Sequence, residues 1–196
     1  MASEVGICNL ALSNIRAGSI NSFDEASSQA QLCRLKYPVL RDQALEDAPW
    51  QFSHRLIALA LLTDEVHGWT YVYQYPNDCL RINKLIGDVV LPTDTKIPYE
   101  IFNIGDNKVI VSNEANLRID YRAKVTDPNL FNNQFVIALS HLLGGELAIP
   151  IAGVDKGRSL RQDEFKLYNA YLSAATAGNS NEQYSSMQES EFITVR

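Results

Sequence analysis

Residues 116–128 read NLRIDYRAKVTDP, and within them one hydrophobic pattern gives way to another. Leu117, Ile119 and Tyr121 alternate with charged residues, which predicts a β-strand with one buried and one solvent-facing side. Asp127, or the threonine before it, can then cap a helix, and the proline after it suits a first helical turn. A strand followed at once by a helix start indicates a chain of mixed α+β class.

Helical periodicity continues downstream of this stretch. Gly144-Gly145 costs about 1 kcal/mol per glycine relative to alanine within a helix, so we expect close helix packing there. Pro150 is expected to end this helix, and a last helix is expected to begin near Asp155, with Glu164 on or near its solvent-facing side. The apolar residues spaced three and four apart that predict a buried helix are Phe131, Phe135, Ala138, Leu139, Leu142, Leu143 and Leu147.

Two helices are also predicted upstream. Cys8 and Leu12 belong to the apolar face of a first helix, which is expected to end at Gly18. A sustained repeat of apolar residues from Ala26 to Ala44 predicts a longer second helix, and Pro49 is expected to end it.

Between the two pairs of helices, residues 50–124 turn to a period of two with aromatic and β-branched runs, which is typical of strands. The tripeptide Gly105-Asp106-Asn107 separates two such runs, residues 99–104 and 108–112. Because these three residue types tolerate a positive φ, the segment predicts a β-hairpin.

The expected fold is therefore α+β, with a helical bundle core, an antiparallel β insertion and an extended C-terminal arm. The bundle is expected to contain two N-terminal and two C-terminal helices. Residues 1–49 and 126–177 form the expected helical core, residues 50–125 the β insertion, and residues 178–196 a flexible C-terminal docking arm.

Composition restricts the function. The 196 residues carry 17 basic and 23 acidic side chains, a net charge of −6, which disfavours a general electrostatic grip on nucleic acid. No window approaches the roughly 18–20 uninterrupted apolar residues of a membrane span, so no membrane partner is expected. Three cysteines form no disulfide framework, and neither they nor the three histidines show metal-ligand spacing. We expect no metal or cofactor and synthesis in a reducing cytoplasm.

Enzymatic residues are sparse. Cys33 is the candidate nucleophile and His54 its candidate base, because cysteine catalysis needs both groups within hydrogen-bond reach. Cys33, however, lies on the apolar face of the second predicted helix, where cysteines are usually inert packing residues. The sequence therefore predicts a protein that is not an enzyme, with a small phage-encoded hydrolase as the weakest alternative.

An aromatic row formed by Trp69, Tyr71, Tyr73 and Tyr75 has a spacing of two, which predicts that all four rings project from one face of a strand. Such a row can be a stacking platform for sugar or single-stranded nucleic acid, or a packing face at a domain or subunit interface. No basic residue lies between Arg55 and Arg81, and this favours the interface.

The C-terminal residues form a polar linker with an apolar end. Residues 178–191 are dominated by Asn, Ser, Gln and Glu, a composition that cannot bury enough apolar surface alone. Phe192, Ile193, Val195 and Arg196 follow, and β-branched residues can add to the sheet edge of a partner. We interpret this segment as a docking arm, the alternative being an ordinary frayed terminus.

In order and spacing, several strings resemble the head-to-tail adaptors of short-tailed phages, the tail tubular protein A or gatekeeper-type adaptor family. The resemblance covers residues from about 5 to 175, and no single string is diagnostic. The strings are residues 7–12 (ICNLAL), 30–50 with Tyr37, Arg41-Asp42 and Pro49-Trp50, 75–81 (YPNDCLR), 111–113 (VSN), 119–121 (IDY) leading into 126–128 (TDP), and 147–150 (LAIP).

This resemblance implies a non-enzymatic virion protein of the tail or neck. Members form a ring, here expected to be a dodecamer, between the portal protein and the tail nozzle protein, with genomic DNA passing through the lumen without sequence-specific binding. The family brings no catalytic or cofactor residues. It implies an arm that reaches the portal, which corresponds here to residues 178–196. The alternative from another class is a carbohydrate- or nucleic-acid-binding module that uses the aromatic row.

Overall fold

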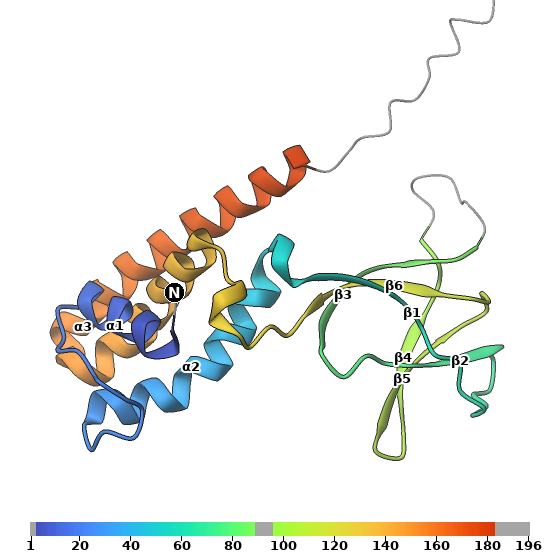
Figure 1. The fold of residues 1–196 in the computed structure, drawn as a ribbon, viewed down its shortest axis with the longest axis horizontal. Helices are drawn as coiled ribbons and strands as arrows, with labels where there is room; N and C mark the ends of the chain where they lie inside the picture. The colour runs from blue at the N-terminus through green and yellow to red at the C-terminus, as the bar shows by residue number, and fades with distance from the viewer. Residues whose placement is uncertain (1–2, 89–95, 183–196) are drawn as a thin grey trace, which may run out of the picture.

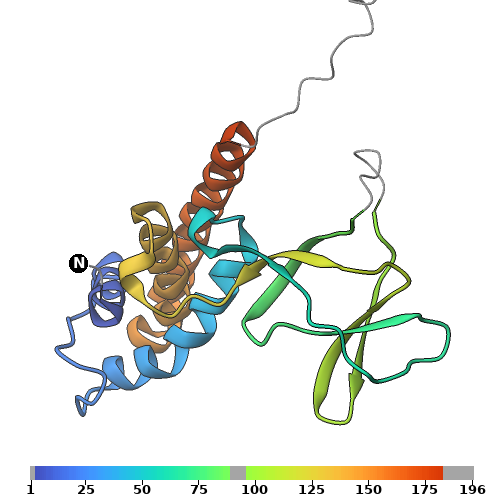
Figure 2. The ribbon, with the colours of Figure 1, turned by 45° about the vertical axis from the view of Figure 1, so that its right-hand side comes forward.

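A computed structural model describes residues 3–88 and 96–182 and shows a mixed α+β protein (Figure 1). The helices gather at one end of the molecule and the strands at the other, and both views agree on this separation (Figures 1 and 2). In chain order the elements are α1 (Glu4–Asn14), α2 (Ser28–Asp47), the 3-10 helix η1 (Gln51–Ser53), β1 (His54–Ala58), β2 (Tyr71–Gln74), β3 (Cys79–Ile86), β4 (Glu100–Ile104), β5 (Asn107–Ser112), β6 (Arg118–Ala123), the 3-10 helix η2 (Pro128–Leu130) and α3 (Asn133–Glu182).

The strands form two antiparallel sheets of three strands each, ordered β1-β6-β3 and β2-β5-β4. Ile119 and Tyr121 from β6 share one buried cluster with Tyr73 and Ile110 of the other sheet. The alternation predicted for the strand after residue 116 is confirmed, because its apolar residues are buried and the charged ones between them are at least partly exposed. We call this two-sheet unit, residues 54–123, the β lobe.

The predicted hairpin is also confirmed. β4 pairs antiparallel with β5, and Ile104 lies opposite Asn107 at its tip. Gly105 occupies the turn with a φ of 58°, a left-handed conformation that glycine adopts without steric cost.

Helix α3 contains a break, and residue spacing predicted it at the wrong position. Pro150 lies inside the helix, and the non-helical residue is Gly153, with φ 78° and ψ 171°. The chain reverses there, so the second half of α3 returns along the first half. Three contacts record this antiparallel path: Gln134 with Tyr171, His141 with Glu164, and Glu146 with Arg161.

Close approach of the two halves depends on glycine. A Cβ added to Gly157 would lie 2.7 Å from Cα of Ile149 and 2.8 Å from the carbonyl oxygen of Ala148, which are backbone atoms. A Cβ added to Gly145 would lie 3.1 Å from the ring of Phe165. The close packing predicted for Gly144-Gly145 is thereby confirmed.

Many apolar residues of α3 lie in the protein core. Among the described helices, α3 alone is long and apolar enough by composition to cross a membrane, yet 56% of its most apolar 18-residue window is buried within the protein. Its side chains share a core cluster with residues of α1 and α2, including Leu12 and Leu45. A core helix passes the same compositional test as a membrane span, so this feature carries no membrane assignment.

Polar contacts join the C-terminal end of α2 to the β lobe. The carbonyl oxygen of Glu46 accepts hydrogen bonds from Arg81 and Arg122, and burial, then the neighbouring Arg81 guanidinium, lower the pKa of Arg122. Asp47 accepts a 2.6 Å hydrogen bond from the hydroxyl of Tyr168 in α3. One helix end therefore contacts both the β lobe and the returning half of α3.

The C-terminal helix is longer than predicted. Expected to end at residue 177, it continues to Glu182, so residues 178–182 belong to α3 and not to the arm. Phe192, Ile193, Val195 and Arg196 lie outside the described residues, and their role as a docking arm stays a prediction.

Gly157→Ala is expected to destabilise the protein by about 1–3 kcal/mol, since the new methyl group meets backbone atoms that cannot move aside. Gly178→Ala is the matched control, because a Cβ at this helical position meets nothing within 4 Å and alanine favours helix by up to about 1 kcal/mol. Urea unfolding of both variants measures the difference. Equal stabilities would contradict the packing described for α3.

Candidate interaction surfaces

The aromatic row does not lie on one face. Tyr71, Tyr73 and Tyr75 pack in the cluster between the two sheets, where the first two ring centroids are 6.3 Å apart. Trp69 instead packs with Val72 and its neighbours on the other side of the sheet, so the prediction of a shared face is wrong for this residue. The reason is local: β2 begins only at Tyr71, and the chain before it is a turn in which Gly68 has a φ of 87°.

The tyrosines of this row are core residues of the β lobe. Tyr73 and Tyr75 are 2% and 8% exposed, and the hydroxyl of Tyr73 donates a 2.8 Å hydrogen bond to the carbonyl oxygen of Glu114. Burial is also the main cause that raises the pKa of Tyr73. These two rings therefore offer almost no free surface for stacking on a ligand.

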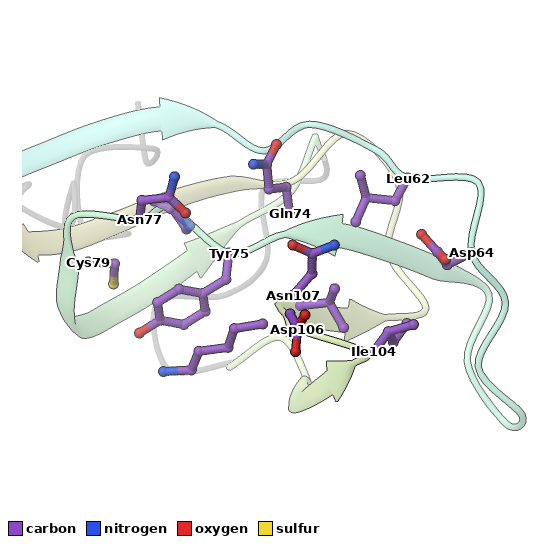
Figure 3. Close-up of a pocket in the computed structure, with 12 residues that line it drawn as sticks. Leu62, Asp64, Gln74, Tyr75, Asn77, Cys79, Ile104, Asp106 and Asn107 are labelled. Carbon is purple, nitrogen blue, oxygen red and sulfur yellow. The ribbon is translucent and has the colours of Figure 1, made fainter.

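A pocket of about 520 Å³ opens on the β lobe, and of the aromatic row only Tyr75 lines it (Figure 3). Nζ of Lys108 lies 3.9 Å from the centroid of the Tyr75 ring. Figure 3 shows Cys79 and Asn77 at one end and Asp64 at the other. The remaining lining residues are Leu62, Gln74, Pro76, Ile104, Asp106, Asn107 and Val109.

Many of the side chains that line this pocket carry groups that form hydrogen bonds. Burial raises the pKa of Cys79, which keeps its thiol protonated and makes it a poor nucleophile at neutral pH. Among the residues described, no cluster of His, Cys, Asp and Glu has the arrangement of a metal site. The amide and carboxylate groups that line the pocket can form hydrogen bonds with a polar ligand.

Cys33 and His54 are not brought together. Cys33 is fully buried in the helical core, in hydrogen-bond contact with Cys8. His54 begins β1, where its ring contacts Asn83 and lies 3.8 Å from a carboxylate oxygen of Asp120. Neither residue has the other as a partner, so the pair offers no activated thiol.

A buried polar cluster in the helical core was missed by sequence reasoning. Glu164, predicted on or near the solvent-facing side, is only 6% exposed and accepts a contact from His141 Nδ1 at 2.8 Å and from Asn14 at 3.3 Å. The ring of Tyr171 stacks on His141. Residue spacing gave no sign of this cluster, because its members come from α1 and both halves of α3.

The strongest candidate surface is a pair of open strand edges. Each sheet has two outer strands, β1 and β3 in one and β2 and β4 in the other. Residues 60–62 bond to β2, whereas β1 and β4 carry apolar side chains that remain exposed. Leu56 and Ile57 in β1 are 56% and 40% exposed, and Ile101 and Phe102 in β4 are 43% and 37% exposed. Exposed apolar strand edges are templates for pairing with another chain.

Comparison with known proteins adds no assignment. A scan against models of protein families finds no match, and a search of curated proteins finds no relative.

Tyr73→Ala is expected to cost about 3–5 kcal/mol of stability, the range for removing a large aromatic side chain from a core. Tyr73→Phe is the matched control and should cost only about 1 kcal/mol, because it removes just the hydrogen bond to Glu114. Thermal or urea unfolding distinguishes the two. If Tyr73→Ala were as stable as the parent, the residue would not belong to the core of the β lobe.

Proposed function

We propose that the chain is a structural protein of a short-tailed phage virion, a ring-forming adaptor between the portal and the tail nozzle. The order of its elements agrees with the resemblance described above: two helices, a β insertion and a long C-terminal helix. In this proposal the chain is not an enzyme, and genomic DNA passes through the ring without sequence-specific contacts. Twelve copies are expected on the same resemblance.

The observation that carries the proposal is the pair of open apolar edges on β1 and β4. A protein that acts alone usually protects such edges with charge, proline or a covering segment. Here the two edges belong to different sheets, so one copy can offer different edges to its two neighbours. Contacts between unlike surfaces generate rings when the rotation closes.

Contacts between the helices support a rigid helical part in each copy of such a ring. We propose that α1, α2 and the two halves of α3 act as one bundle. Glu146 supports this, since its carboxylate contacts Lys36 of α2 at 2.8 Å and Arg161 of the returning half of α3 at 2.9 Å. Asn14 connects α1 to both halves of α3 through His141 and Glu164.

The C-terminal arm is proposed to contact the portal. The second half of α3 extends beyond the other helices in both views and ends at Glu182 (Figures 1 and 2). Residues 183–196 continue from this end, and their apolar terminus supplies side chains for a partner's sheet edge or groove. In the proposal, free copies stay monomeric until the portal aligns them.

Mass photometry with portal rings from the same phage tests this function. The full chain is expected to add a collar of uniform mass to the portal, confirmed by negative-stain electron microscopy, and a chain of residues 1–182 is expected to remain folded and fail to bind. Circular dichroism controls for folding of the shortened chain. Failure of the full chain to bind portals would contradict the adaptor, and normal binding by residues 1–182 would contradict the arm.

A further inference from the structure

Two cysteines from different helices meet inside the helical core. Cys8 belongs to α1 and Cys33 to α2, and both side chains are fully buried in the same apolar cluster. Their sulfur atoms are in hydrogen-bond contact, and both residues are free thiols in the structure. The contact therefore joins two helices that are otherwise connected in sequence only through the linker of residues 15–27.

Contact between two such short side chains requires the helices to approach closely, and an alanine beside each cysteine allows this. Ala11 follows Cys8 by three residues on α1, and Ala30 precedes Cys33 by three residues on α2. Both alanines are fully buried, and residues three apart share one face of a helix. Small side chains at a helix contact shorten the distance between the axes. Close approach is what a disulfide needs, since its two Cα atoms lie only about 6 Å apart.

Polar bonds on both sides of the pair hold α1 in place. The side chain of Asn9 donates to the carbonyl oxygen of Ile20 at 2.9 Å and accepts from its N–H at 2.8 Å. At the other end of α1, Asn14 donates to the buried carboxylate of Glu164 at 3.3 Å. The fold therefore keeps the two sulfur atoms together, and groups held in this way react with each other at a high effective concentration.

The contact also makes the two thiols unequal. Hydrogen bonding to the Cys8 thiol lowers the pKa of Cys33. The same hydrogen bond, followed by burial, raises the pKa of Cys8. Because the thiolate is the nucleophile in exchange with a disulfide, Cys33 is the sulfur that reacts first and Cys8 the one that reacts second.

We infer that Cys8 and Cys33 are a redox site, at which a small-molecule disulfide such as oxidised glutathione converts the two thiols into a disulfide between α1 and α2. The Cys33 sulfur attacks one sulfur of the oxidant, whose S–S bond breaks, and one glutathione thiolate leaves. The Cys8 sulfur then attacks the Cys33 sulfur of this mixed disulfide and displaces the second glutathione. The two cysteines lose two protons and two electrons, and the two glutathione molecules gain them as thiols.

This inference goes beyond the proposed function and is tested on the free chain, without a portal. The bond closes a loop that contains the linker between α1 and α2, and so it restricts the unfolded chain and stabilises the folded one. A chain in a reducing cytoplasm stays a dithiol, whereas a virion outside the cell meets oxidising surroundings that close the bond. Because both sulfur atoms are fully buried, the oxidant reaches them only when α1 opens locally, and closure is expected to be slow.

Equilibration with glutathione measures how well the fold places the two thiols. Chains carrying Cys79→Ser are incubated in mixtures of reduced and oxidised glutathione, in buffer and in concentrated urea, starting from both the reduced and the oxidised chain. Intact mass after alkylation gives the fraction of disulfide, which is expected to be favoured about 100-fold more in the folded chain than in urea. Trypsin cleaves after Arg16 and Arg34, so the bond is identified by a link between peptides 1–16 and 17–34. An equal preference in buffer and in urea would overturn the inference.

Urea unfolding of the same chains gives an independent measure. The oxidised Cys79→Ser chain is expected to unfold at a midpoint about 1 M higher in urea than the reduced chain, and a thiol reductant should remove the difference. A chain carrying both Cys8→Ser and Cys79→Ser is the matched control, because Cys33 alone cannot close the bond and oxidant should not stabilise it. A disulfide-bonded chain no more stable than its reduced form would also overturn the inference, since the bond would then strain the contact between α1 and α2.

Discussion

The close contact between the two halves of α3 is the constraint on which the rest of the structure depends. Gly157 lies against the backbone of Ala148 and Ile149, and only a residue without a side chain fits there. Because the chain reverses at Gly153, the second half returns Tyr168 to the end of α2, where it donates to Asp47. The β lobe is attached at that same helix end, so the packing of α3 supports its attachment.

The β lobe meets a different physical requirement. Its tyrosines fill the space between two three-stranded sheets. The strand order makes β1 and β4 outer strands, and the described residues show no backbone partner for their outer edges. Another strand can hydrogen-bond to the backbone groups of an open edge and can also bury the apolar side chains beside it. The proposed ring follows from that requirement, whereas the pocket beside Tyr75 is lined by hydrogen-bonding groups and by a Cys79 thiol whose pKa burial raises.

Local pattern predicted the parts of the fold that local interactions determine. The alternation in β6 and the turn at Gly105 depend on neighbouring residues, and both were predictable. Other features depend on distant partners. Glu164 is buried because His141 and Asn14 meet it, and the break in α3 falls at Gly153, since a proline at position 150 is accommodated inside the helix. The open edges can be identified only from the order of the strands in each sheet, and the spacing of residues along the sequence does not specify that order.

A cryo-electron microscopy map of the chain assembled on its portal tests the central claim most directly, because it resolves which surfaces of neighbouring copies meet. The account predicts a closed ring in which the open edges of β1 and β4 of each copy are covered by neighbouring copies, with the C-terminal arm against the portal. A ring held together by other surfaces, with β1 and β4 both exposed to solvent, would contradict it.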